Sequence, residues 1–141
     1  MRRFPIFAIP GSGRYLLQPI FVEDIAELAA NAGKEESNLV IDAVGPEVFA
    51  FEDLARTIAI SVGAGQKFAH VSPGLAQRML QWMGPVVGDV ILTREEIEGL
   101  MANLLISRGR AGGRTRFTEW LTNNAPILGN TYTSELKKHY Q

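Results

Sequence analysis

Short apolar runs alternate along the chain with stretches whose apolar residues have helical spacing, and the clearest case lies near the start. Pro19–Val22 is apolar and partly β-branched, which predicts a short buried strand. From the end of this run, apolar residues such as Ile25 recur at the three- and four-residue spacing of one helix face. Asp24 is expected to accept from the free N–H groups at the start of that helix. We therefore expect a strand that leads directly into a helix over Glu23–Ala32.

The same two patterns predict further elements along the chain. Apolar runs predict strands at Phe4–Ile9, Leu39–Ala43, Val48–Ala50 and Lys67–Val71. Helical spacing predicts helices at Phe51–Val62, from Pro73 onward, from the capping box Thr93-x-x-Glu96 through Leu105, around Phe117–Leu121 and over Tyr132–Tyr140. Arg108–Arg114 has only Ala111 as an apolar anchor, and we expect it to be a mobile loop. The predicted fold is a small α/β domain, with about five short strands in a mixed sheet and five or six helices.

Composition narrows the possible functions. A chain of 141 residues with 46% hydrophobic content suffices for one compact domain over residues 1–141. The formal net charge of −1 gives no electrostatic reason to expect binding to nucleic acid or to an anionic membrane. No apolar run approaches the roughly 20 residues of a membrane span. The chain has no cysteine, so it has no disulfide and no thiolate chemistry, which fits a cytoplasmic protein.

Neither histidine has the neighbours that a metal site requires. His70 lies inside the apolar run Lys67–Val71, and His139 lies near the end of the chain. No second histidine or paired carboxylate stands at metal-ligand spacing beside either of them, so we expect no metal site. His70 is expected to be a hydrogen-bonded strand residue, or a group that lines a pocket in a larger assembled protein.

Four short motifs follow one another along the chain. They are, in order, Gly11-Ser12-Gly13-Arg14, Gln18-Pro19-Ile20-Phe21-Val22-Glu23-Asp24-Ile25-Ala26, Gly45-Pro46-Glu47 and Leu92-Thr93-Arg94-Glu95-Glu96. Together they resemble the back half of the extended and atypical short-chain dehydrogenases/reductases. This family includes NAD-dependent nucleotide-sugar epimerases and dehydratases, and a reductase-like branch associated with respiratory complex I. The resemblance covers almost the whole chain and is closest to the complex I-associated branch.

The resemblance implies a partial Rossmann-type protein that lacks its nucleotide-binding front half. The parent protein would use NAD or NADP, but this chain has no strand–G-x-x-G-x-x-G–helix unit to hold a pyrophosphate. The loop that begins at Gly11 has Leu16 where the third glycine would be. The family's Tyr-x-x-x-Lys catalytic pair is absent as well, since Tyr15 is followed by Pro19 at that spacing. We therefore expect no catalytic and no cofactor-binding residues in this chain, and read it as the C-terminal part of a larger parent.

The substrate-binding residues implied by the resemblance are Arg14, Tyr15, Gln18 and Phe21. Sugar-nucleotide members often carry an arginine where this chain has Gln18. Glutamine gives up the charge-assisted grip on phosphate, which favours the reductase branch over a nucleotide-sugar substrate. Two simpler interpretations stay open: Gln18 bonds backbone at a turn, and Arg14 is a surface arginine.

Three functions follow as hypotheses. The first is the substrate-binding lobe of an NAD(P)-dependent epimerase, dehydratase or reductase, with a small-molecule substrate and with its chemistry carried elsewhere. The second is the same lobe in a non-catalytic scaffold or assembly-factor relative. The third is a free-standing interaction module. As a fragment cut from its front half, the chain is expected to form a homo-oligomer through an uncovered sheet edge around Leu39–Ala43, whereas a monomer would favour the free-standing module.

Overall fold

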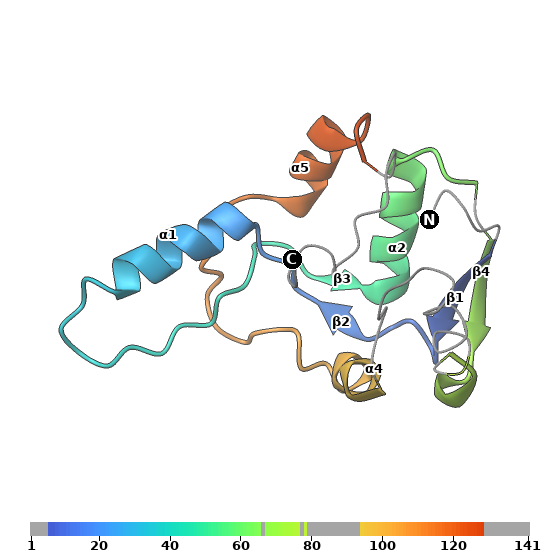
Figure 1. Cartoon of the computed structure of the whole chain (residues 1–141), viewed down its shortest axis with the longest axis horizontal. Helices are drawn as coiled ribbons and strands as arrows, with labels where there is room; N and C mark the ends of the chain where they lie inside the picture. Colours follow the sequence, from blue (N-terminus) through green and yellow to red (C-terminus); the bar gives the residue numbers. More distant parts are fainter. Residues whose placement is uncertain (1–5, 66, 77, 79–93, 129–141) are drawn as a thin grey trace, which may run out of the picture.

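The computed structural model describes residues 6–65, 67–76, 78 and 94–128, which form a mixed α/β fold with two small sheets (Figure 1). Residues 73–76 are also helical. Thr93 of the capping box and the helix predicted at Tyr132–Tyr140 lie outside the described residues. In chain order the elements are β1 (Ile6–Pro10), β2 (Leu16–Leu17), α1 (Val22–Ala32), β3 (Phe49–Ala50), α2 (Phe51–Ser61), β4 (Lys67–Val71), α4 (Arg94–Met101) and α5 (Phe117–Asn124).

The first sheet pairs β1 and β4 in parallel, in a register that runs from Ile6 opposite Lys67 to Pro10 opposite Val71. Helix α2 packs on this sheet through Phe7, whose ring centroid lies 6.3 Å from that of Phe51. Both strands were predicted from their apolar runs, and β4 has the predicted bounds. Proline cannot donate to a ladder, which suits its place as the last residue of β1.

The second sheet pairs β2 and β3 antiparallel, and Leu17 also forms a parallel bridge with Leu105. The strand predicted at Pro19–Val22 is wrong: the ladder lies two residues earlier, and α1 already begins at Val22. The Gln18 N–H donates to the Leu105 carbonyl at 3.0 Å. Pro19 has no N–H to continue this ladder, so pairing ends there.

Helix α2 agrees with the prediction within a residue, although its first position carries no capping side chain. The cap residue is Ala50, and the first two N–H groups of the helix instead donate to backbone carbonyls of the preceding loop. The Phe51 N–H bonds the Tyr15 carbonyl and the Glu52 N–H bonds the Gly13 carbonyl, both at 3.0 Å. Backbone carbonyls from a distant loop therefore satisfy the first N–H groups of the helix, as a capping side chain would.

Helix α1 and the segment that returns from it, residues Val22–Val44, extend away from the two sheets, and we call them the arm (Figure 1). No residue of α1 is buried. The strand predicted at Leu39–Ala43 is wrong as well, because these residues form no ladder and are exposed. A strand needs a neighbouring strand to bond, and none lies beside this segment in the part of the chain that the structure describes.

Helix α4 ends at Met101, so the prediction that it continues through Leu105 is wrong. Asn103 adopts a positive φ of 56°, a left-handed conformation that asparagine tolerates. Its side-chain oxygen accepts from the Leu16 N–H at 2.6 Å. This bond ties the turn after α4 to β2, and Leu104 has 73% of its surface exposed.

Candidate functional site

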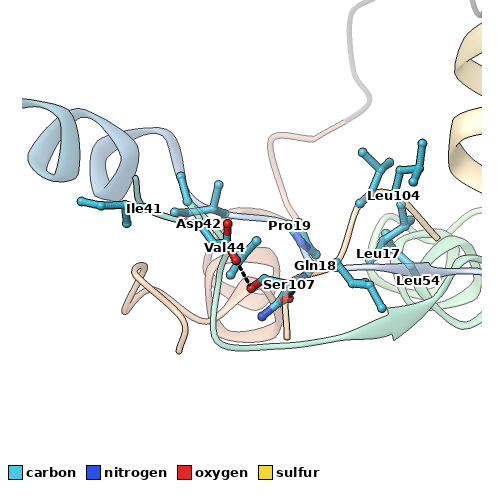
Figure 2. Close-up of a pocket in the computed structure, with 13 residues that line it drawn as sticks. Leu17, Gln18, Pro19, Ile41, Asp42, Val44, Leu54, Leu104 and Ser107 are labelled. Carbon is cyan, nitrogen blue, oxygen red and sulfur yellow. Dashed lines mark hydrogen bonds between the residues drawn. The ribbon is translucent and has the colours of Figure 1, made fainter. Parts of the chain in front are cut away.

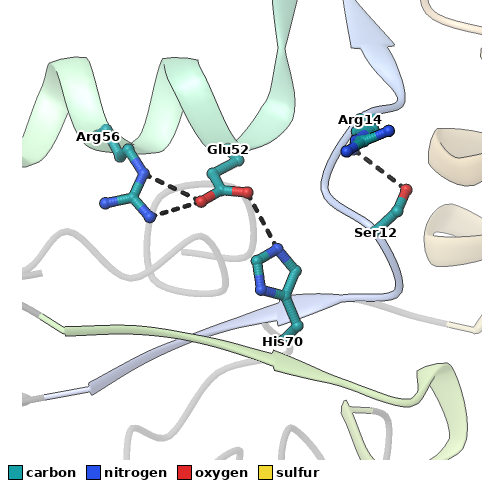
Figure 3. A network of polar contacts seen from close by, with 5 residues as sticks. All are labelled: Ser12, Arg14, Glu52, Arg56 and His70. Atoms are coloured by element: carbon teal, nitrogen blue, oxygen red, sulfur yellow. Dashed lines mark hydrogen bonds and ion pairs between the residues drawn. The ribbon is translucent and has the colours of Figure 1, made fainter.

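Polar side chains gather where the parallel strands β1 and β4 end (Figure 3). On the first turn of α2, Glu52 accepts from the Arg56 guanidinium through one carboxylate oxygen and contacts His70 Nε2 at 3.0 Å through the other. Arg56 also lies over the Phe68 ring, 4.6 Å from its centroid. The three polar groups link α2 to β4 and stay accessible, since the His70 side chain is 46% exposed.

The electrostatics of this cluster favour a charged Glu52. Hydrogen bonds from Arg56, the larger cause, and from His70 lower the pKa of the Glu52 carboxyl below its ordinary value, against a smaller opposing effect of desolvation. The carboxylate thus stays ionised and holds both partners. His70 was expected either to be hydrogen-bonded or to line a pocket, and its bond to Glu52 agrees with the first of these.

The loop that begins at Gly11 brings the backbone close to this cluster. Gly11 and Gly13 have φ values of 62° and 67°, in the left-handed region that favours glycine. The Gly11 N–H donates to the Val71 carbonyl at 2.8 Å, which continues the β1–β4 pairing into the loop. A Cβ on Gly13 would lie 2.9 Å from the Ile9 side chain and 3.1 Å from Glu52 Cβ, so a larger residue does not fit.

Arg14 and Tyr15, two of the four predicted substrate-binding residues, lie in this loop in different environments. Arg14 is exposed, and its N–H donates to Ser12 Oγ at 3.3 Å. Tyr15 is only 5% exposed and stacks on Phe51, with 5.1 Å between the ring centroids. The Tyr15 hydroxyl is buried and has no hydrogen-bond partner among the described residues, and burial raises the pKa of Tyr15 to about 12.

Gln18, the third predicted residue, uses both ends of its amide to join backbone segments far apart in sequence. Its Nε2 donates to the Gly45 carbonyl at 2.8 Å, and its Oε1 accepts from the Ser107 N–H at 3.0 Å. The interpretation that Gln18 bonds backbone at a turn therefore describes its contacts. Phe21, the fourth residue, packs near Trp120 of α5, with 6.4 Å between the ring centroids.

Gln18 also lines a groove of about 590 Å³ between β2, the end of the arm and residues 104–107 (Figure 2). The lining is mostly apolar. Its three polar side chains are already engaged, because Gln18 bonds backbone and Ser107 Oγ donates to Asp42 Oδ2 at 2.5 Å. The groove thus offers few free polar groups to a substrate, and the four predicted residues do not converge on one pocket.

Two carboxylates that the motifs did not single out for this role hold the segment after the groove. Asp24 was predicted to cap its own helix, but α1 has no side-chain cap. Asp24 instead accepts from the N–H groups of Arg114 and Thr115, both at 2.8 Å, and from Thr115 Oγ1 at 3.0 Å. Glu47 accepts from the Thr118 N–H and hydroxyl in the same way.

The segment predicted as a loop, Arg108–Arg114, forms no helix or strand, but backbone hydrogen bonds fix its last two residues. The Gly113 N–H donates to the Val44 carbonyl at 2.9 Å, and the residue is buried. Added Cβ atoms at Gly112 and Gly113 would lie 2.8 Å from Leu28 and 2.9 Å from Ile20, so the glycines allow close packing. The sequence did single out Asp24, but its position at the start of a helix led us to assign it to that helix and not to Arg114 and Thr115.

No protein-family model and no curated protein matches this chain. Among the residues described, no group of three or more metal-binding side chains lies together. No helix in the described ranges is long and apolar enough to cross a membrane.

Proposed function

We propose that this chain is the substrate-binding lobe of an NAD(P)-dependent epimerase, dehydratase or reductase, and that the chemistry is carried outside it. The observation that carries the proposal is the polar cluster of Glu52, Arg56 and His70 beside the carboxyl ends of β1 and β4, with the exposed Arg14 on the loop that follows β1. Ligands of open α/β proteins bind outside the carboxyl ends of parallel strands.

The cluster suits a small polar substrate. Arg14 and His70 are exposed, and the lowered pKa of Glu52 keeps its carboxyl ionised, so this end of the β1–β4 sheet carries both hydrogen-bond donors and an acceptor. The Arg14 side chain has no hydrogen-bond partner among the described residues, which leaves its guanidinium available for a carboxylate, phosphate or hydroxyl. We assign Gln18 to holding the loop and β2 in place, since both ends of its amide are engaged.

The described residues do not fit a dinucleotide. The glycine loop at Gly11 leads from one strand to another, where a dinucleotide site needs a strand followed by a helix. The first two N–H groups of α2 donate to the carbonyls of Tyr15 and Gly13, so they cannot hold a pyrophosphate. In this proposal NAD or NADP binds to a different part of the functional protein.

An interaction module, either free-standing or in a non-catalytic scaffold, is the second candidate. The observation that favours it is the arm, in which no residue of α1 is buried and Leu39–Ala43 is exposed. An apolar surface of this kind marks a contact site for another polypeptide.

Amide chemical shifts of the chain, titrated with dihydroxyacetone as a small carbonyl probe and with UDP-glucose as a nucleotide-sugar probe, test the proposal. We expect saturable shifts at Arg14, Glu52 and His70 with at least one probe. Arg14→Ala should abolish them, while Arg110→Ala, which changes another exposed arginine, should leave them intact. Shifts from neither probe, or shifts unchanged in Arg14→Ala, would overturn the substrate-lobe assignment in favour of the interaction module.

A further inference from the structure

The most unusual surface of the chain is the returning segment of the arm. Leu39, Val40 and Ile41 are 51%, 96% and 44% exposed, in a run whose residue types favour a strand. Their backbone groups form no ladder with any other described residue. A bare apolar run with free backbone donors and acceptors is a template for strand pairing.

We propose that this segment pairs antiparallel with the same segment of a second copy of the chain, across a twofold axis at Val40. The inference does not rest on the proposed function, because it uses residues of the arm alone. A twofold contact of this kind is isologous, so each residue of one copy meets its counterpart position in the other.

The sequence selects this register. With the axis at Val40, Val40 lies opposite its own copy and Leu39 lies opposite Ile41 on both sides, so the three exposed apolar residues of the run meet one another. Asp42 then faces Asn38, whose amide can donate to it. Moving the axis by half a residue or by one residue toward Ile41 places Asp42 opposite Leu39 or Val40. Parallel pairing in register stacks Asp42 on Asp42.

The flanking charges complement each other in the same arrangement. Glu36 of one copy lies opposite Val44 of the other, with Glu35 beside it. In each copy Ser107 Oγ bonds Asp42, so the exposed arginines Arg108 and Arg110 lie close to this end of the segment. In the proposed pair the acids of each copy therefore lie at the end of the segment that is next to its partner's arginines, twice by symmetry, whereas acid would lie opposite acid in the parallel alternative.

Cysteine cross-linking tests the axis directly, because the chain contains no native cysteine. In an antiparallel pair, opposite Cα atoms lie about 4.5–5.5 Å apart, within the range that a disulfide spans. Val40→Cys should give a covalent dimer under mild oxidation. The matched control is Ile60→Cys on α2, which is also an exposed apolar site at 80% and should stay mainly monomeric on a denaturing gel.

Reversing the charges on either side of the apolar run tests the proposed charge pairs, with dimerisation measured by sedimentation at low salt. Glu36→Lys and Arg108→Glu should each weaken the dimer about tenfold or more, since each places like charges together twice. An equimolar mixture of the two variants should regain the dimer, because both contacts then join opposite charges. High salt should reduce these differences.

Three outcomes would overturn the proposal. The first is a monomer at all concentrations, which would leave the segment to a strand from a different polypeptide. The second is cross-linking that is equal in Val40→Cys and Ile60→Cys. The third is a dimer whose charge variants do not recover on mixing, which would place its interface elsewhere. Because no ligand enters these measurements, their failure is distinct from failure of the substrate-lobe assignment.

Discussion

The buried hydroxyl of Tyr15 is a residue-scale feature with an expected cost. Its ring packs on Phe51, but the hydroxyl has no partner. We expect Tyr15→Phe to raise the free energy of unfolding by about 1 kcal/mol, because it removes an unsatisfied polar group. Urea denaturation measures this change. A loss of similar size would instead show that the hydroxyl is hydrogen-bonded in solution.

The same residue gives a pH dependence with a definite sign. The folded-state pKa of Tyr15, about 12, lies above the ordinary value of 10.0. The folded protein therefore holds the proton more tightly, so this contribution to stability is complete below pH 10 and is lost as the pH rises toward 12. Tyr15→Phe should lack that loss.

At the residue scale, we expect a structural role for Gln18 and a binding role for Arg14, and their substitutions should affect stability differently. Gln18→Ala leaves the Gly45 carbonyl and the Ser107 N–H without their partner, so we expect a loss of about 1–3 kcal/mol in the free energy of unfolding. Arg14→Ala should change it by less than about 0.5 kcal/mol, because Arg14 is exposed. Equal losses in urea denaturation would contradict this division of roles.

At the scale of elements, two carboxylates hold residues 114–118 in place. Asp24 of the arm binds Arg114 and Thr115, and Glu47 binds Thr118 in the first turn of α5. Hydrogen bonds from Thr115 and Arg114 lower the pKa of Asp24. At Glu47 desolvation is the largest single cause and raises the pKa, but hydrogen bonds from Thr118 and Phe117 and the charge of Arg116 together lower it below its ordinary value. The depressed folded-state values mean that this stability is present above the ordinary values of 3.8 and 4.5 and is lost as the pH falls below them.

Fluorescence of Trp120 should report this loss of stability at acid pH, because its ring packs near Phe21, which directly precedes the arm. In Asp24→Asn the acid transition should shrink, because one of the two titrating carboxyls is gone. Thr57→Ala is a suitable control, since the Thr57 hydroxyl bonds only its own helix at the Asp53 carbonyl. An acid transition that is unchanged in Asp24→Asn would show that this carboxylate does not hold the segment.

The end of helix α4 gives a second test between elements. Ile97 is 3% exposed and Leu104 is 73% exposed. We expect Ile97→Ala to cost about 2–5 kcal/mol of unfolding free energy through a cavity, and Leu104→Ala less than about 1 kcal/mol. Chemical denaturation ranks the two. The reverse order would restore the longer helix that the apolar spacing predicted.

Helices α1 and α2 and strand β4 lie within one residue of their predicted bounds, although no residue of α1 is buried. The apolar runs at β1 and β4 find each other, and α2 packs on the sheet they form. Leu39–Ala43 has the same kind of run but no partner strand among the described residues, so propensity alone does not make it a strand. Strand β2 ends before Pro19, where the prediction placed its start, and the carboxylate of Asp24 binds a loop that is distant in sequence. Both outcomes depend on tertiary contacts that no local pattern contains.

For the whole molecule, the arrangement of turns and helix starts predicts that the chain does not bind a dinucleotide. The described glycine turn joins two strands, and the start of α2 is closed by loop carbonyls. We therefore expect no saturable binding of NADH or NADPH in the micromolar range, because the glycine turn does not lead into a helix and the first N–H groups of α2 are already bonded. Titration followed by the fluorescence of the two tryptophans, Trp82 and Trp120, measures this. Saturable quenching would contradict the prediction, and its loss in Gly13→Ala would locate the dinucleotide at the glycine turn.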